Sequence, residues 1–150
     1  MRWVIWIALA MLGVGAEAFA QTRPTLSLLI EEGNEGWRQC GVTEKTFSNP
    51  AAAALRRQGI EVVENAMPFL YIQGTILRDD TGKNCIYELN VSVIHFKSPE
   101  RIGRFLAKGN DTVMLCSQGD LGFVEAAGVA RELAEKVGSQ IRRCLAELSY

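Results

Sequence analysis

The amino-acid sequence predicts an α+β fold, a two-layer sandwich in which an antiparallel-rich sheet of four to five strands carries two main helices on one face and a short extra helix. The run from Cys85 to Phe96 alternates apolar and polar residues, as a strand with one buried face does. Residues 43–59 and 126–148 instead repeat apolar residues at helical spacing. The predicted order is strand, helix, three strands, short helix, strand and long helix, without repeats or linkers.

The first strand is predicted from its apolar residues, and the first helix from the residues at its two ends. Residues 25–30 (TLSLLI) are β-prone and mostly apolar, so they predict a buried strand. Thr43 offers a helix N-cap, and Gly59 stands where a helix commonly ends in the left-handed conformation. Pro50 predicts a kink or a restart within this helix, because proline removes a backbone donor. Residues 60–63 then predict a short strand.

Residues 69–77 and the alternating run predict an antiparallel hairpin around a polar turn at residues 79–84. Gly74 leaves a gap in the apolar face of the first of these strands, which a close neighbour could fill. A slip of one residue would turn every side chain to the wrong face, so matching the apolar faces fixes the register. The matched pairs are Leu70 with Val93 and Ile72 with Val91.

A second apolar set lies on the opposite face of this hairpin. In the predicted register Phe69 and Tyr71 adjoin Ile94, with Phe96 beyond, while the rest of that face is polar. Large bare apolar patches are uncommon on soluble monomers, so a cover is expected. That cover is either the chain's own short helix or a partner.

The short helix is predicted to begin at Ser98, with proline at its first position, and to end at Gly109. Its basic stripe is either a solvated surface or a contact site for an anionic membrane, a lipid headgroup or an acidic protein. Its apolar stripe is the candidate cover for the second apolar set. The basic stripe comprises Lys97, Arg101, Arg104 and Lys108, and the apolar stripe comprises Ile102, Phe105 and Leu106. The candidate contact surface consists of Phe69, Tyr71, Ile94, Phe96, Arg101, Arg104 and Lys108.

The last part of the chain predicts one more strand and the longest helix. The strand is expected near residues 112–117, before a turn at residues 119–122 (GDLG). The helix is expected to place one apolar stripe on the sheet. Its members are Ala126, Ala130, Leu133, Val137, Ile141, Cys144, Leu145 and Leu148.

Residues 1–20 have the features of a secretory signal peptide. The single basic residue Arg2 precedes an apolar run, and Ala18 and Ala20 form an Ala-x-Ala cleavage site. The apolar run is shorter than the ~20 residues that a membrane-spanning helix needs. We therefore expect cleavage, no transmembrane segment afterwards, and a single exported domain over residues 21–150, either periplasmic or secreted.

Four cysteines lie in the exported part, and an even number in an oxidising compartment predicts two disulfides. They are Cys40, Cys85, Cys116 and Cys144. Their successive spacings of 45, 31 and 28 residues contain no Cys-x-x-Cys clip, and the chain has one histidine, so no metal site is predicted. Four cysteines allow three pairings, and the order of the elements favours Cys40 with Cys85 and Cys116 with Cys144.

No catalytic constellation is found in the sequence. His95 lies at the end of a strand on the apolar face, without an acid or nucleophile to nominate beside it, which favours a core or rim histidine. Asp79 and Asp80 are neighbours in a turn, so they point apart, and turns favour Asp for backbone reasons. No phosphate-binding glycine loop and no Gly-x-Ser-x-Gly elbow occurs. The sequence predicts no catalytic residue and no cofactor, and it favours a non-enzyme while leaving an enzyme open.

Three short motifs resemble a pattern in a group of small exported bacterial proteins of unknown function. They are Cys40-Gly-Val-Thr-Glu44, Leu55-Arg-Arg-x-Gly-Ile-x-Val62 and Phe69-Leu-Tyr-Ile72. The order of elements is also similar to that of the N-terminal domain of the envelope protein TolB and of periplasmic activators of penicillin-binding proteins. This likeness of fold implies binding or assembly work in the envelope and assigns no functional residue.

The net charge limits the classes of partner that the sequence predicts. Sixteen basic and 17 acidic residues give a net charge of -1, which predicts neither nucleic acid nor a strongly anionic partner. We therefore expect a periplasmic or secreted binding or accessory module that contacts an envelope protein or an anionic surface. The alternatives are a secreted inhibitor, a small-ligand binder and, less favoured, an enzyme. An apolar pocket around His95 would favour these alternatives, whereas a flat exposed patch would favour the first function.

Overall fold

The computed structural model describes residues 23–97 and 111–148, which form one five-stranded sheet and three helices. The elements are β1 (Thr25–Ile30), α1 (Glu35–Gln39), α2 (Glu44–Arg57), β2 (Glu61–Val62), β3 (Phe69–Arg78), β4 (Asn84–Lys97), β5 (Asp111–Glu125) and α3 (Val129–Glu147). The strands lie in the order β2-β1-β3-β4-β5, with β1 parallel to both of its neighbours and the other pairs antiparallel. The predicted α+β class is confirmed.

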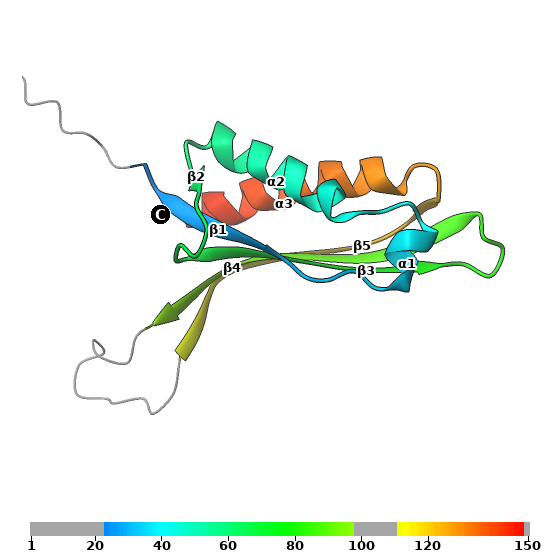
Figure 1. Ribbon diagram of the computed structural model, residues 1–150, viewed down its shortest axis with the longest axis horizontal. Helices are drawn as coiled ribbons and strands as arrows, with labels where there is room; N and C mark the ends of the chain where they lie inside the picture. Colours follow the sequence, from blue (N-terminus) through cyan, green and yellow to red (C-terminus); the bar gives the residue numbers. More distant parts are fainter. Residues whose placement is uncertain (1–22, 98–110, 149–150) are drawn as a thin grey trace, which may run out of the picture.

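Helices α2 and α3 lie together over one face of the sheet, and no described helix covers the opposite face (Figure 1). Alternate side chains of a strand point to opposite faces, so every second residue of β3 and β4 enters the core beneath these helices. The large buried core side chains are Phe47, Leu55, Leu70, Ile72, Ile76, Tyr87, Leu89, Val91, Leu133, Val137 and Ile141. None of the described helices is long and apolar enough to cross a membrane.

The predicted hairpin register is confirmed. Leu70 pairs with Val93 and Ile72 with Val91, as the matching of apolar faces requires. The gap at Gly74 is filled by a ring from α2, because a Cβ added there would lie 2.9 Å from Cζ of Phe47.

The last strand is longer than its pattern predicts. β5 continues through residues 119–122, so the predicted turn is wrong. Gly122 serves packing instead of chain reversal, because a Cβ there would lie 2.2 Å from the ring of Tyr87. The chain turns later, at residues 126–128, so α3 begins at Val129 and not at Ala126.

Helix α1 was not predicted, and it closes the outer edge of β3. β1 pairs with β3 only as far as Ile72, so the polar backbone groups further along β3 need other partners. Trp37 Nε1 donates to the carbonyl of Gly74 at 2.6 Å. The Asn34 amide donates to the carbonyl of Ile76 at 2.9 Å and accepts its N–H at 3.4 Å. A short helix thus replaces the missing strand.

Helix α2 begins and ends where the sequence predicts. The N–H of Thr43 donates to Thr46 Oγ1 at 3.2 Å, which caps the first turn. Gly59, just beyond the last turn, has a φ of 72°, the left-handed conformation that glycine adopts at little cost. The helix runs unbroken through Pro50, so the predicted restart does not occur.

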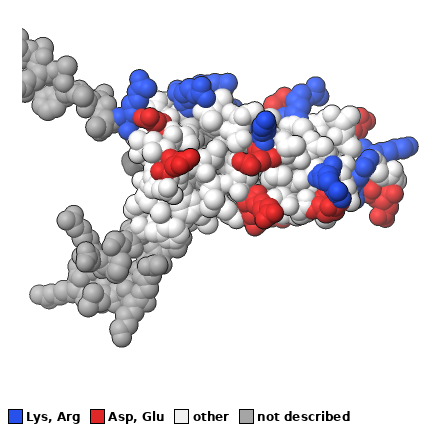
Figure 2. All heavy atoms as spheres, in the orientation of Figure 1, with Lys and Arg blue, Asp and Glu red and all other residues white. Residues whose placement is uncertain are grey.

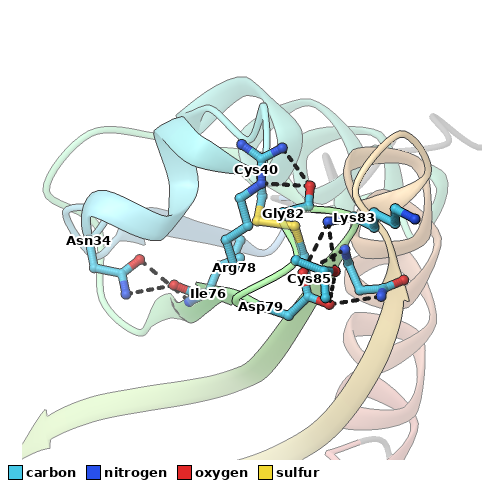
Figure 3. The surroundings of a disulfide bond; sticks show 10 residues. Asn34, Cys40, Ile76, Arg78, Asp79, Gly82, Lys83 and Cys85 are labelled. Atoms are coloured by element: carbon cyan, nitrogen blue, oxygen red, sulfur yellow. Dashed lines mark hydrogen bonds between the residues drawn. A yellow bond between two sulfur atoms is a disulfide. The ribbon is translucent and has the colours of Figure 1, made fainter.

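Two disulfides tie the helical layer to the sheet, in the pairing that the order of the elements favours. Cys40, after α1, is bonded to Cys85 of β4, with Cα atoms 6.3 Å apart. Cys116 of β5 is bonded to Cys144 of α3, with Cα atoms 5.5 Å apart. Figure 3 shows the first bond beside the turn between β3 and β4.

Candidate functional site

The sheet face that no described helix covers, which we call the helix-free face, carries the side chains that alternate with the core. Its large apolar side chains form two groups, one at each end of the strands, with polar residues between them. We call these groups the Phe69 patch and the Leu121 patch. The Phe69 patch consists of Leu29, Met67, Phe69, Tyr71, Ile94, Phe96 and Met114, and the Leu121 patch consists of Leu77, Ile86, Leu121 and Phe123.

The Phe69 patch unites the four apolar residues that the sequence nominates for the contact surface. Phe69 pairs with Ile94 across β3 and β4, and Tyr71 lies one position inward on the same face. The rings of Phe69 and Phe96 have centroids 5.4 Å apart. Phe96 is nevertheless exposed, so the described residues leave the patch open.

Two further members of the patch come from strand pairing that no local pattern reveals. Leu29 faces the same side as Tyr71 because β1 pairs with β3 in parallel. Met114 pairs with Ile94, and a bulge between Val93 and Ile94 sets that register. Met114 is 57% exposed, so it enlarges the open part of the patch.

The loop between β2 and β3 adds Met67 to the patch. β2 and β3 lie on opposite sides of β1, so this loop must cross β1. Ser27 faces the helix-free side together with Phe69, and its Oγ donates to the carbonyl of Ala66 at 2.9 Å, which places the crossing on that side. A groove of about 420 Å³ runs beside it. Its apolar lining includes Leu28, Leu29, Val62, Val63, Met67 and Phe69.

A hydrogen-bonded polar band separates the two patches. Ser92 Oγ donates to Ser117 Oγ at 3.2 Å, and Ser117 Oγ donates to Asn90 Oδ1 at 3.1 Å. Ser92 is buried although none of the described helices covers it. The band therefore holds β4 and β5 together and divides the face into two separate apolar surfaces.

Charge on the helix-free face is sparse. Among the described side chains, the charged residues at strand positions that face away from the helices are Glu61, Glu88 and Glu125, and none is basic. Figure 2 views the sheet from its edge; the limb formed by the end of β4 and the start of β5 is white there, while charged side chains lie over the rest of the molecule in this view. The face is apolar and faintly acidic.

The other half of the predicted contact surface lies outside the described residues. This concerns Arg101, Arg104 and Lys108, together with the short helix predicted from Ser98 and its apolar stripe of Ile102, Phe105 and Leu106. Whether that stripe covers Phe69 and Tyr71 stays a prediction.

A cleft of about 620 Å³ lies between the end of β1 and the start of α2. Ile30, Trp37 and Val42 contribute its apolar part, and its rim includes Glu31, Glu32 and Glu44. His95 does not line this cleft. The imidazole Nδ1 of His95 is buried and has no hydrogen-bond partner among the described residues. This cleft is therefore not the apolar pocket around His95 that would favour an inhibitor, a small-ligand binder or an enzyme.

Asp79 closes the turn between β3 and β4 and does not form a carboxylate pair. Its Oδ1 accepts the N–H groups of Lys83 and Asn84 at 3.0 and 3.1 Å, and its Oδ2 accepts Asn84 Nδ2 at 2.9 Å and Thr81 Oγ1 at 2.8 Å (Figure 3). The hydrogen bonds from Asn84, aided by that from Thr81, lower the pKa of Asp79 to about 2. Within residues 23–97 and 111–148, no group of three or more metal-binding side chains is found.

Comparison with known proteins finds matches among solved structures. No family model matches the chain, and no curated protein matches it. The chain is similar to the crystal structure of the rare lipoprotein B from Shewanella oneidensis, with 16% sequence identity, 83% of this chain and 90% of the other covered, and a TM-score of 0.34. A likeness at this level carries no functional argument. The resemblance of its motifs to small exported proteins stays a prediction.

Proposed function

We propose that the protein is an exported binding module that docks a partner protein against the Phe69 patch. The observation that carries this proposal is the gathering of seven large side chains, three of them aromatic, on a sheet face that no described helix covers. Aromatic residues and Met are enriched in the cores of protein interfaces, where a few of them supply most of the binding energy. A broad patch of this kind suits contact with a protein better than enclosure of a small ligand.

The charge pattern favours a protein over an anionic membrane surface. Anionic headgroups attract basic side chains, yet the described charged residues on this face are acidic. The matching surface is therefore apolar, with neutral or basic residues around it. The predicted basic stripe, which comprises Lys97, Arg101, Arg104 and Lys108, supports the rival, a membrane contact, which the experiment below distinguishes.

We place the protein in the periplasm or outside the cell. This location rests on the predicted signal peptide at residues 1–20. The two disulfides support it, because such bonds form and persist in oxidising compartments.

Site-specific photo-crosslinking in cells tests the proposed function. A photoreactive amino acid at position 114 should form a discrete adduct with one envelope or secreted protein. The same amino acid at position 77 should form none, although Leu77, at 56% exposed, matches Met114 in exposure and lies on the same face. Once the partner is known, Met114→Ser and Leu29→Ser should each weaken its binding by about tenfold, with Leu77→Ser unchanged.

Three outcomes would contradict the proposal. Adducts of equal yield from positions 114 and 77 would show no preference for the Phe69 patch. If neither position gave an adduct, no partner would be bound at the Phe69 patch. The third is binding to vesicles with anionic lipid that Met114→Ser leaves intact and the charge reversals Arg101→Glu and Arg104→Glu abolish. That result would assign the contact to the basic stripe.

A further inference from the structure

Strand β5 forms an edge of the sheet, and half of its polar backbone groups point outward. The N–H of Ala126 donates to the carbonyl of Lys83 at 2.9 Å, in continuation of the β4–β5 register. In an antiparallel ladder the residues that face the neighbouring strand alternate, so the even-numbered residues from 116 to 126 face β4. The N–H and C=O groups of the odd-numbered residues 117–125 therefore face away from the sheet.

The two long edges of the sheet differ in how they are covered. Where β1 ends, Trp37 and Asn34 supply side-chain hydrogen bonds to the exposed backbone of β3. By contrast, no backbone hydrogen bond joins the outer edge of β5 to any other described residue. Native proteins usually cover such an edge or blunt it, because it is a template for another strand. Within the described part of the chain, the β5 edge is thus open to pairing.

An apolar row of side chains runs across the sheet and stops at this edge. Leu77 pairs with Ile86, and Ile86 pairs with Phe123, so the row crosses β3, β4 and β5 on the helix-free face. Phe123, at the end of this row, is 65% exposed, and Leu121, two residues away on the same face of β5, is 74% exposed. A further strand beside β5 would continue the row and bury these two side chains.

We propose that two copies of this chain pair antiparallel through β5, with a two-fold axis at Leu121. Outward-facing residues then meet only outward-facing residues, so each exposed N–H and C=O from 117 to 125 gains a partner. The pairs are Leu121 with Leu121 of the second copy, Phe123 with Gly119 of the second copy, and Glu125 with Ser117 of the second copy.

The sequence of β5 is complementary to itself in this register. The large ring of Phe123 faces Gly119 of the second copy, an arrangement in which an aromatic side chain covers a glycine on the neighbouring strand. On the helix side, Asp120 faces Gly122 of the second copy, so its carboxylate meets no opposing side chain. Asp120 also keeps its own partner, Lys136 Nζ, at 2.7 Å. No other two-fold register of this strand sets Phe123 against a glycine, which favours a second copy as the occupant.

The contact area sets the expected affinity. Strand pairing over residues 117–125 with two large apolar side chains from each copy buries less than the ~800 Å² per partner of a standard interface. We therefore expect a dimer with a dissociation constant of roughly micromolar order. Pairing would also join the two helix-free faces into one surface, with the Phe69 patches left free.

Sedimentation equilibrium of the exported chain, purified from a periplasm with both disulfides formed, tests the dimer. The mass should rise from monomer to dimer over about 1 to 500 µM. Leu121→Lys should weaken association by about tenfold or more, because it sets two like charges opposite each other at the axis. Ser117→Lys should strengthen it by about threefold, because each new ammonium faces Glu125 of the second copy.

Leu77→Lys is the matched control, because it places the same charge in the Leu121 patch but on β3, away from the edge. Association equal to that of the unchanged protein is expected. Equal weakening by Leu77→Lys and Leu121→Lys would show that copies stack face to face, and would overturn strand pairing. A monomer at every concentration, with the far-UV circular dichroism of the folded chain, would overturn the dimer itself. Met114→Ser should change neither the association nor the circular dichroism. The dimer and the proposed binding at the Phe69 patch can therefore fail independently.

Discussion

Gly122 lies directly against the ring of Tyr87. A Cβ built at Gly122 would come within 2.2 Å of Cζ and 2.4 Å of the hydroxyl oxygen of Tyr87. The ring is buried between β5 and α3, where its hydroxyl donates to Glu132 Oε1 at 3.3 Å. Burial raises the pKa of Tyr87, so the phenol stays neutral and acts as a donor. The absence of a side chain at Gly122 is what lets an aromatic residue of β4 fill the space beneath α3.

Replacing Gly122 by alanine should therefore destabilise the fold. The added methyl group overlaps a buried ring, which costs about 1 to 3 kcal/mol. Gly119→Ala is the control on the same strand, because its Cβ would meet only the carbonyl of Leu89, at 3.9 Å. Urea denaturation at low protein concentration measures both variants. Equal stabilities would show that Tyr87 does not depend on Gly122.

The same contact explains where the sequence pattern succeeds and fails. The hairpin register follows from alternation alone, since Leu70 and Ile72 can face the core in one way only. The glycines at 119 and 122 look like turn residues in the sequence. Gly122 is needed because the ring of Tyr87, on another strand, lies against it, and no local pattern can reveal such a contact.

The candidate site likewise contains residues that the sequence predicts and residues that only the tertiary structure reveals. Phe69 and Tyr71 are found from the excess of apolar residues in one half of a strand. Leu29 and Met114 belong to the site through a parallel pairing and a bulge, and both are tertiary features. Helix α1 is five residues long, too short to show a helical repeat, so the cover over β3 could not be predicted either.

Gly36 and Gly138 should respond to alanine in opposite directions. A Cβ at Gly36 would lie 1.7 Å from the carbonyl oxygen of Ile76, a backbone atom that cannot rotate away. We expect Gly36→Ala to cost about 3 kcal/mol or more. Gly138 lies within α3 with open space, its nearest neighbour being Arg142 Nη1 at 3.5 Å, so alanine should stabilise the helix by about 0.5 to 1 kcal/mol. Thermal unfolding of the two variants against the unchanged chain checks the signs, and the same sign for both would refute the packing argument.

Each disulfide should contribute a large share of the stability. They close loops with sequence separations of 45 and 28 residues, and the chain-entropy model gives about 4 kcal/mol for each. Loss of both bonds is then comparable with the whole unfolding free energy of a typical domain, about 5 to 15 kcal/mol. The paired variants Cys40→Ala with Cys85→Ala, and Cys116→Ala with Cys144→Ala, should each remain folded but lose this amount in guanidinium denaturation. The variant with all four replaced should be largely unfolded at 37 °C. A four-fold variant as stable as the unchanged chain would contradict the prediction.

Asp79 should make the turn between β3 and β4 sensitive to acid. Its pKa is lowered from 3.8 to about 2, chiefly by hydrogen bonds from the side chain and backbone of Asn84, so the ionised carboxylate stabilises the folded chain. For a lowered pKa, this contribution is fully present above about pH 4 and is lost as the pH falls through about 2. The stability difference between the unchanged chain and Asp79→Asn should therefore shrink over that range. The carboxyl carbon of Asp79 should titrate near 2 by NMR, and Asn84→Ala should shift its midpoint back toward 3.8 because it removes the largest contribution. A midpoint near 3.8 in the unchanged chain would mean that the hydrogen bonds to Asp79 do not hold the turn in solution.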